Sequence, residues 1–160
     1  MAAPVLSSGK IQDYKKLFGK LKQRKASADD VLFAETHSKV FSEINCLECA
    51  NCCKTHSPIV LQSDIMRISK QMGISSHMFM SKYLLLDEDG DWVFHTQPCP
   101  FLGGDNRCTI YDARPKACRE YPHTNRKRMF QIEKITMKNA EICPAVTRIL
   151  DIVITKINSK

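Results

Sequence analysis

The sequence lacks several features that would assign it to a familiar class of enzyme. Glycine is scarce, with six residues among 160, and neither a dinucleotide-binding G-x-G-x-x-G nor a phosphate-binding P-loop occurs. No run approaches the roughly 20 consecutive apolar residues that a membrane helix needs. The first ten residues contain neither the charged leader nor the apolar core of a signal peptide. We therefore expect a cytoplasmic chain without a membrane span, and we find no complete catalytic set.

The composition is otherwise that of an ordinary globular chain, with 43% hydrophobic and 26% charged residues. The formal net charge is +7, but this value treats every cysteine as a neutral thiol. Eight thiolates around two zinc ions would lower the charge by four, and four thiolates around a cluster core of charge +2 would lower it by two. The basic composition is therefore weak evidence for a nucleic-acid partner.

Cysteine is the abundant residue with chemical meaning, because eight cysteines occur in 160 residues. An even number of cysteines in a secreted chain would indicate disulfides, whereas in an intracellular chain the same number indicates metal or redox chemistry. Since we expect the cytoplasm, we interpret all eight as metal ligands. They are Cys46, Cys49, Cys52, Cys53, Cys99, Cys108, Cys118 and Cys143.

The first four cysteines form the pattern C-x2-C-x2-C-C over residues 46–53. Two intervening residues allow the backbone to turn so that both sulfurs converge on one centre. Adjacent side chains normally diverge, so we expect Cys52 and Cys53 not to be equal ligands of one ion. The eight thiols could make two sets of four, or one set of four and a redox pair.

The spacing favours an iron–sulfur cluster over zinc. Structural zinc sites usually combine two C-x2-4-C knuckles, but here only the first knuckle exists and the later cysteines come singly. Three closely spaced cysteines with a distant fourth suit a 4Fe-4S cluster, and zinc remains the alternative. His56 and His123 could join either site, although a surface or hydrogen-bonding role is the preferred interpretation.

The predicted organisation is a basic helical arm over residues 1–26, followed by a cysteine-cluster domain over residues 27–160. The fold class is α+β: a small, loop-rich, metal-stabilised domain with flanking helices and a short β-hairpin. The acidic stretch DEDGD lacks the EF-hand spacing, so we interpret it as a turn and not as a calcium site. Hydrophobic periodicity and turn residues predict helices over 9–44 (broken near Ala26), 63–73, 75–86 and 143–157, a hairpin over 84–95 and a strand within 126–138.

Taken together, the cysteine segments resemble the YkgJ-type cysteine-cluster proteins, which are described as zinc- or iron-chelating domains. The resemblance runs from about Cys46 to Pro144 and rests on C-x2-C-x2-C-C, P-C-P-F-L, C-x-I-Y-x-x-R-P and C-R-x-Y-P in this order. It implies a metal-binding domain without an assigned reaction. The module is also similar to one that accompanies flagellin lysine methylation, for which an iron–sulfur cluster is implied.

The arginines between the later cysteines allow two interpretations. Arg114 and Arg119 lie close in sequence to Cys108 and Cys118, so their charges could stabilise thiolates and raise the reduction potential of a cluster. Equally, they could anchor the loop to backbone carbonyl groups. We also expect metal removal to unfold the middle of the chain, because residues 98–122 contain few apolar side chains for a core of their own.

Three functions are compatible with the sequence. The first is a binding or redox module that holds an iron–sulfur cluster or zinc and acts with another protein. The second is a protein-modifying enzyme, or its subunit, of the lysine-methylating kind. The third, which we rank lowest because lysine runs are usually solvated helix faces, is a nucleic-acid binder that uses the segment RKRMF or the cations Lys15, Lys16, Lys20, Lys22, Arg24 and Lys25.

Overall fold

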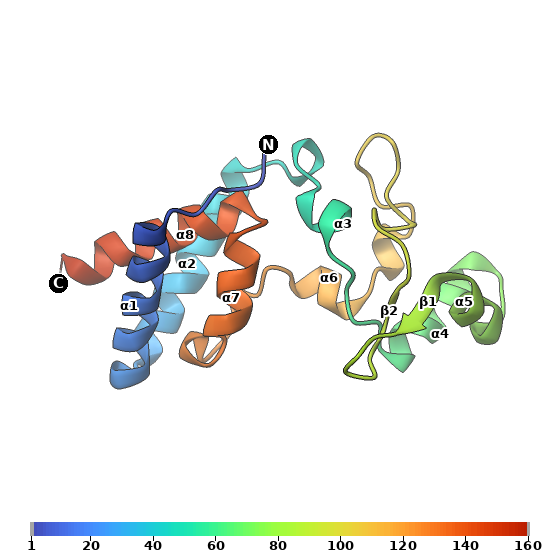
Figure 1. Ribbon diagram of the computed structural model, residues 1–160, viewed down its shortest axis with the longest axis horizontal. Coiled ribbons are helices and arrows are strands. Elements are labelled where there is room, and N and C mark those ends of the chain that lie inside the picture. Colours follow the sequence, from blue (N-terminus) through green and yellow to red (C-terminus); the bar gives the residue numbers. More distant parts are fainter. Residues whose placement is uncertain (1, 160) are drawn as a thin grey trace. The chain divides into compact units, whose positions relative to one another are not determined.

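Two separately packed units make up the computed structural model, which describes residues 2–159 (Figure 1). The helical unit combines residues 1–46 with residues 122–160, and the cysteine unit comprises residues 47–121. Helices predominate and one small antiparallel sheet is present, so the predicted α+β class is confirmed. The unit boundaries do not coincide with the predicted division at residue 26.

Within residues 2–159, the helical unit contains four α-helices and one short 3-10 helix. They are α1 (Ser8–Arg24), α2 (Ser27–Glu43), η3 (Met129–Gln131), α7 (Glu133–Ala140) and α8 (Pro144–Asn158). Pro144 opens α8, where its missing N–H costs no intrahelical hydrogen bond. None of the helices in the described residues is long and apolar enough to cross a membrane.

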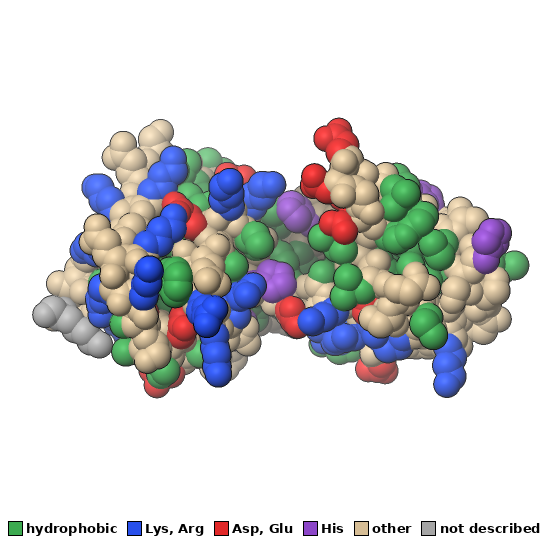
Figure 2. All heavy atoms as spheres, turned by 90° about the horizontal axis from the view of Figure 1, so that it is seen from below, with side chains coloured by type: hydrophobic (Ala, Val, Ile, Leu, Met, Phe, Trp, Pro, Cys, Tyr) green, Lys and Arg blue, Asp and Glu red, His purple; other side chains and the backbone are tan. Residues whose placement is uncertain are grey.

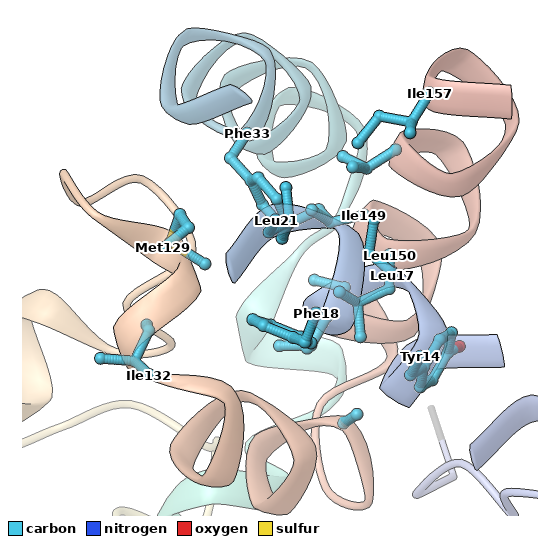
Figure 3. Packing of buried hydrophobic residues seen from close by; sticks show 14 of the residues in the cluster. Tyr14, Leu17, Phe18, Leu21, Phe33, Met129, Ile132, Ile149, Leu150 and Ile157 are labelled. Atoms are coloured by element: carbon cyan, nitrogen blue, oxygen red, sulfur yellow. The ribbon is translucent and has the colours of Figure 1, made fainter. Parts of the chain in front are cut away.

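The first helix is part of the core and not a peripheral arm. Its apolar residues recur every three or four positions, which places them on one face of the helix. That face packs against α8 and α7 in a single cluster of buried side chains (Figure 3). The buried residues of α1 are Tyr14, Leu17, Phe18 and Leu21.

The predicted strand within residues 126–138 is wrong. This segment forms η3 and then α7, and both pack against α1. Apolar residues at alternate positions suggested a strand, but Ile132 and Thr136 are also one helical turn apart, and both are buried. The carboxylate of Asp30 accepts hydrogen bonds from the backbone N–H groups of Arg128 (2.6 Å) and Met129 (3.0 Å), which stabilises the turn before α7.

The cysteine unit consists of short elements around a second core. They are η1 (Cys46–Glu48, whose first residue belongs to the helical unit), α3 (Asn51–Thr55), α4 (Gln62–Met72), α5 (Ser76–Tyr83), β1 (Leu84–Leu86), β2 (Trp92–Phe94), η2 (Tyr111–Ala113) and α6 (Lys116–Glu120). The strands pair antiparallel, with Leu84 opposite Phe94 and Leu86 opposite Trp92. The predicted hairpin is therefore confirmed.

Aromatic rings form the centre of this second core. The ring of Phe101 lies 5.0 Å from that of Tyr83, 5.4 Å from that of Phe94 and 6.2 Å from that of Phe79, measured between centroids. Such aromatic pairs contribute free energy in addition to that gained by burying their apolar surface. Because Phe101 and Ile110 are both buried, the segment 98–122 contributes to a core after all.

The acidic turn of the hairpin is held by one of its own carboxylates. Asp87 Oδ1 accepts hydrogen bonds from the backbone N–H groups of Asp89 (3.1 Å) and Asp91 (2.9 Å). Gly90 has a φ of 81°, a conformation that favours glycine. These hydrogen bonds account for the aspartate at the first position of the turn.

The first prediction concerns the buried hydroxyl of Tyr14, which donates to Asp151 Oδ1 at 3.0 Å. Burial, this hydrogen bond and the charge of Asp151 all raise the pKa of Tyr14 above its usual value of 10.0. The folded state therefore favours the protonated phenol, and this contribution is present below pH 10 and lost as the pH rises above it. We expect Tyr14→Phe to lower the free energy of unfolding by about 1 kcal/mol at neutral pH.

The measurement is urea unfolding followed by far-ultraviolet circular dichroism at a series of alkaline pH values. Stability of the wild type should fall more steeply above pH 10 than that of Tyr14→Phe. Parallel pH profiles for the two proteins would contradict the assignment.

Candidate metal centre

Four thiols of the cysteine unit lie close enough to influence one another's ionisation. They belong to Cys53, Cys99, Cys108 and Cys118. Burial, with the charges of the neighbouring thiolates, raises the pKa of Cys99 to about 11 and that of Cys118 to about 12. Burial also raises the pKa of Cys108. A metal that binds these thiols at neutral pH therefore has to displace protons from them.

Cys53 differs from the other three thiols. A hydrogen bond from Cys52 lowers its pKa to about 7, against the effect of burial, and the charge of Lys54 contributes in the same direction as the hydrogen bond. The sulfurs of Cys52 and Cys53 are 3.9 Å apart. The expectation that these adjacent side chains diverge is therefore wrong. Both side chains come from the single turn of α3, which follows a left-handed turn at Ala50 (φ 50°).

A tight loop brings Cys99 and Cys108 to the first cysteine segment. The backbone N–H of Cys99 donates to the carbonyl of Cys53 at 2.8 Å, and Leu102 pairs with Cys108 as an antiparallel bridge. Gly103 leaves room at the bend, because a Cβ there would lie 2.8 Å from Asp105 Oδ1 and 3.2 Å from the carbonyl of Arg107, so that one or both would have to shift. These hydrogen bonds place Cys99 and Cys108 beside Cys53, although they follow it by 46 and 55 positions in the sequence.

The segment with Cys118 is held by a buried carboxylate that the sequence analysis missed. Asp64, on α4, is 0% exposed and accepts from the backbone N–H of Leu61 (3.1 Å) and that of Lys116 (3.2 Å), the first residue of α6. It also accepts from the guanidinium of Arg67 at 2.5 Å. The only sequence signal is an acid and a base three positions apart on a helix, which is equally common on exposed helix faces.

Arg67 extends this link to the loop between Cys108 and Cys118. Its Nη2 donates to the carbonyl of Arg114 at 2.9 Å and that of Ala113 at 3.3 Å. Arg119 donates to the carbonyl of Arg114 at 2.9 Å, as the carbonyl-anchoring interpretation predicted. Arg114 fits both interpretations, carbonyl anchoring and stabilisation of thiolates. It donates to the carbonyl of Tyr111 at 2.7 Å, and its charge lowers the pKa of Cys108 and Cys118 against the larger effect of burial.

The other four predicted ligands are distributed over both units. Cys49 and Cys52 belong to the cysteine unit, and Cys46 and Cys143 belong to the helical unit. No cysteine among the residues that the structure describes forms a disulfide. His56 is exposed and its Nδ1 lies 3.1 Å from the carbonyl of the preceding Thr55.

The donor chemistry of the four gathered thiols suits zinc or an iron–sulfur cluster. Soft thiolate ligands select zinc, copper(I) and iron–sulfur clusters, and a set of four sulfurs indicates zinc or iron–sulfur. Over residues 2–159, no three histidine, cysteine or carboxylate donors already surround one point at ion distance. The thiols are therefore neighbours that a bound group would draw together, and the residues present fit either group.

Comparison with known proteins gives one match. A family model described as "Putative zinc- or iron-chelating domain", and labelled by the motif CxxCxxCC, matches residues 45–144, which is more than half of the chain. The match includes all eight cysteines, from Cys46 to Cys143. No curated protein and no solved structure matches the chain.

The second prediction concerns Asp64 as the support of the cysteine segments. Asp64→Asn removes the charge opposite Arg67 and turns an amide toward backbone N–H groups. We expect a loss of about 3–5 kcal/mol in the free energy of unfolding, as for other broken buried pairs. Urea unfolding followed by the fluorescence of Trp92, the only tryptophan, reports on this unit.

The matched control is Glu120→Gln, which removes a carboxylate from the exposed pair with Lys116 (3.7 Å) and should cost less than about 1 kcal/mol. Equal losses for the two variants would show that Asp64 has no special role.

Proposed function

Because the chain belongs to the CxxCxxCC family of zinc- or iron-chelating domains, we propose that its cysteine unit holds an iron–sulfur cluster through Cys53, Cys99, Cys108 and Cys118. The observation that carries this proposal is the mutual influence of these four thiols, which come from four different segments of one unit. A cubane cluster takes four thiolates, one for each iron. Its ligands are therefore expected from several directions around a volume larger than one ion.

The surroundings of the thiols support a redox or accessory role for this cluster. Cys99 and Cys108 pack against the apolar core that contains Phe101, which limits the access of water from that side. Arg114 brings a positive charge that favours the thiolate forms of Cys108 and Cys118. A nearby cation also favours the reduced, more negative state of a cluster, so it raises the reduction potential. We propose that the protein acts with another protein as such a module.

One distance favours zinc as a second candidate. Two thiolates on one tetrahedral zinc ion, with Zn–S bonds of about 2.3 Å, have sulfurs about 3.8 Å apart. The sulfurs of Cys52 and Cys53 are 3.9 Å apart. A zinc site would combine this pair with two of the later cysteines and would act by stabilising the loops.

The third prediction tests both candidates through metal content. Protein purified without oxygen should contain iron and sulfide and absorb at about 400 nm, as iron–sulfur proteins typically do. Serine at position 53, 99, 108 or 118 should abolish this absorption, because serine is a poor substitute for a thiolate ligand. The control is His56→Ala, an exposed residue of the first cysteine segment, which should retain the absorption.

The two candidates give different results. Colourless protein with one zinc per chain would identify zinc, and not a cluster, as the bound group. This zinc should then be lost in Cys52→Ser as well as in Cys53→Ser. Full iron and sulfide content in all four serine variants would remove these residues from the site.

The fourth prediction concerns metal removal. The core around Phe101 should keep α4, α5 and the hairpin folded without metal, so only the cysteine-bearing segments 49–55 and 98–121 should lose protection. Hydrogen exchange measured by mass spectrometry before and after chelation checks this, with α8 as an internal control. Global unfolding would support the original expectation that the middle of the chain depends on metal, and unchanged exchange would show that the metal does not hold these segments.

A further inference from the structure

The net positive charge of the protein belongs to one of its two units. The helical unit contains sixteen Lys and Arg residues against eight Asp and Glu residues, a net charge of +8. The cysteine unit contains eight against nine, a net charge of −1. Six of the eight cysteines lie in the cysteine unit, and only Cys46 and Cys143 lie in the helical unit. Ionisation of these two thiols on metal binding would lower the net charge of the helical unit by at most two. The metal state therefore does not explain the basic character of the helical unit.

Two basic segments that are far apart in the sequence meet on the surface of the helical unit. The end of α1 and the turn before η3 line one open pocket of about 530 Å³, with Lys25 from the first segment and Lys127 and Arg128 from the second. Figure 2 shows Lys and Arg side chains gathered over one face of this unit. None of these three cations forms an ion pair within residues 2–159.

Several lysines and arginines of the α1 run are, in contrast, already neutralised. Lys16 pairs with Asp13, Lys22 with Glu133 and Arg24 with Asp29. The one carboxylate that lines the pocket belongs to Asp30. Its two oxygens accept hydrogen bonds from the backbone N–H groups of Arg128 and Met129. The pocket thus keeps an excess of positive charge that the protein does not use internally.

Two of the three cations occupy strained backbone positions. Lys25 has a φ of 44° and Arg128 has a φ of 59°, in the left-handed region that glycine tolerates better than other residues. Lys25 is the C-cap of α1, a position where glycine is common. Strain at a site is grounds for a functional hypothesis, and here both strained residues are cations that line the same pocket.

We propose that this basic pocket binds single-stranded nucleic acid, with Lys25, Lys127 and Arg128 contacting successive phosphates. Phe130 is half-buried and also lines the pocket, so an aromatic ring is available to a base next to the bound phosphates. A basic groove combined with an aromatic ring is the usual arrangement of proteins that bind single strands. An anionic membrane fits less well, because Val5, Val31 and Ile135 are the exposed large apolar side chains of this unit and none of them lines the pocket.

The test uses the full chain and a fluorescently labelled single-stranded oligonucleotide of about 20 nucleotides, with binding measured by anisotropy. Lys25→Gly and Arg128→Gly each remove a cation and relieve backbone strain. Each should weaken binding about eightfold at about 50 mM salt and reduce the slope of log K against log salt by about 0.7. Thermal stability should be unchanged or higher in both variants, which separates a lost contact from a lost fold.

Two further variants separate this site from general charge attraction. Lys39→Ala removes an equal charge from an exposed position of α2 outside the pocket, and it should bind almost as the wild type does. Phe130→Leu, which keeps an apolar side chain against the core, should weaken binding at least about fivefold if a base stacks on the ring.

Three outcomes would overturn the proposal. The first is equal binding by Lys25→Gly, Arg128→Gly and Lys39→Ala. The second is capture of phosphatidylserine vesicles, and not of the oligonucleotide, that depends on Lys25 and Arg128. The third is binding of inorganic phosphate alone, with no gain in affinity for the oligonucleotide.

Discussion

The gathering of four thiols in a partly buried site is the constraint on which the cysteine unit depends. Burial and mutual repulsion both oppose the charged form, so Cys99 and Cys118 are protonated at neutral pH when no cation is present. A cationic centre reverses this balance, because each thiolate then faces a positive charge at close range. The site is thus unfavourable for isolated thiolates, and the proposed metal would remove this disadvantage.

Such a site needs support that does not come from the thiols themselves. Asp64 supplies it, since one buried carboxylate holds the start of α4, the start of α6 and the guanidinium of Arg67. Arg67 in turn holds carbonyl groups of the loop between Cys108 and Cys118. A buried charge of this kind is tolerated because every partner is a donor with good geometry. The same network ties the loop before Cys118 to α4.

The two units are stabilised by different interactions and carry different charges. Helix packing around Phe18, Ile149 and Leu150 stabilises the helical unit. The cysteine unit combines a smaller aromatic core with the thiol site. The proposed chemistry follows the same division: the four proposed metal ligands belong to a unit with a net charge of −1, and the excess of cations belongs to the other unit.

The sequence by itself determined α1, α2, α4, α5 and α8, the hairpin and the α+β class, because these depend on local periodicity and turn residues. The short helices α3 and α6 and the helix α7 were not predicted. Only the tertiary structure decided which four thiols gather and that Lys25 meets Arg128, since these pairs are brought together by contacts between segments distant in the chain. Packing also decided the segment 126–138. Its apolar residues are compatible with both a strand and a helix. The segment folds as η3 and α7, which pack against α1 and bury these residues in the same core.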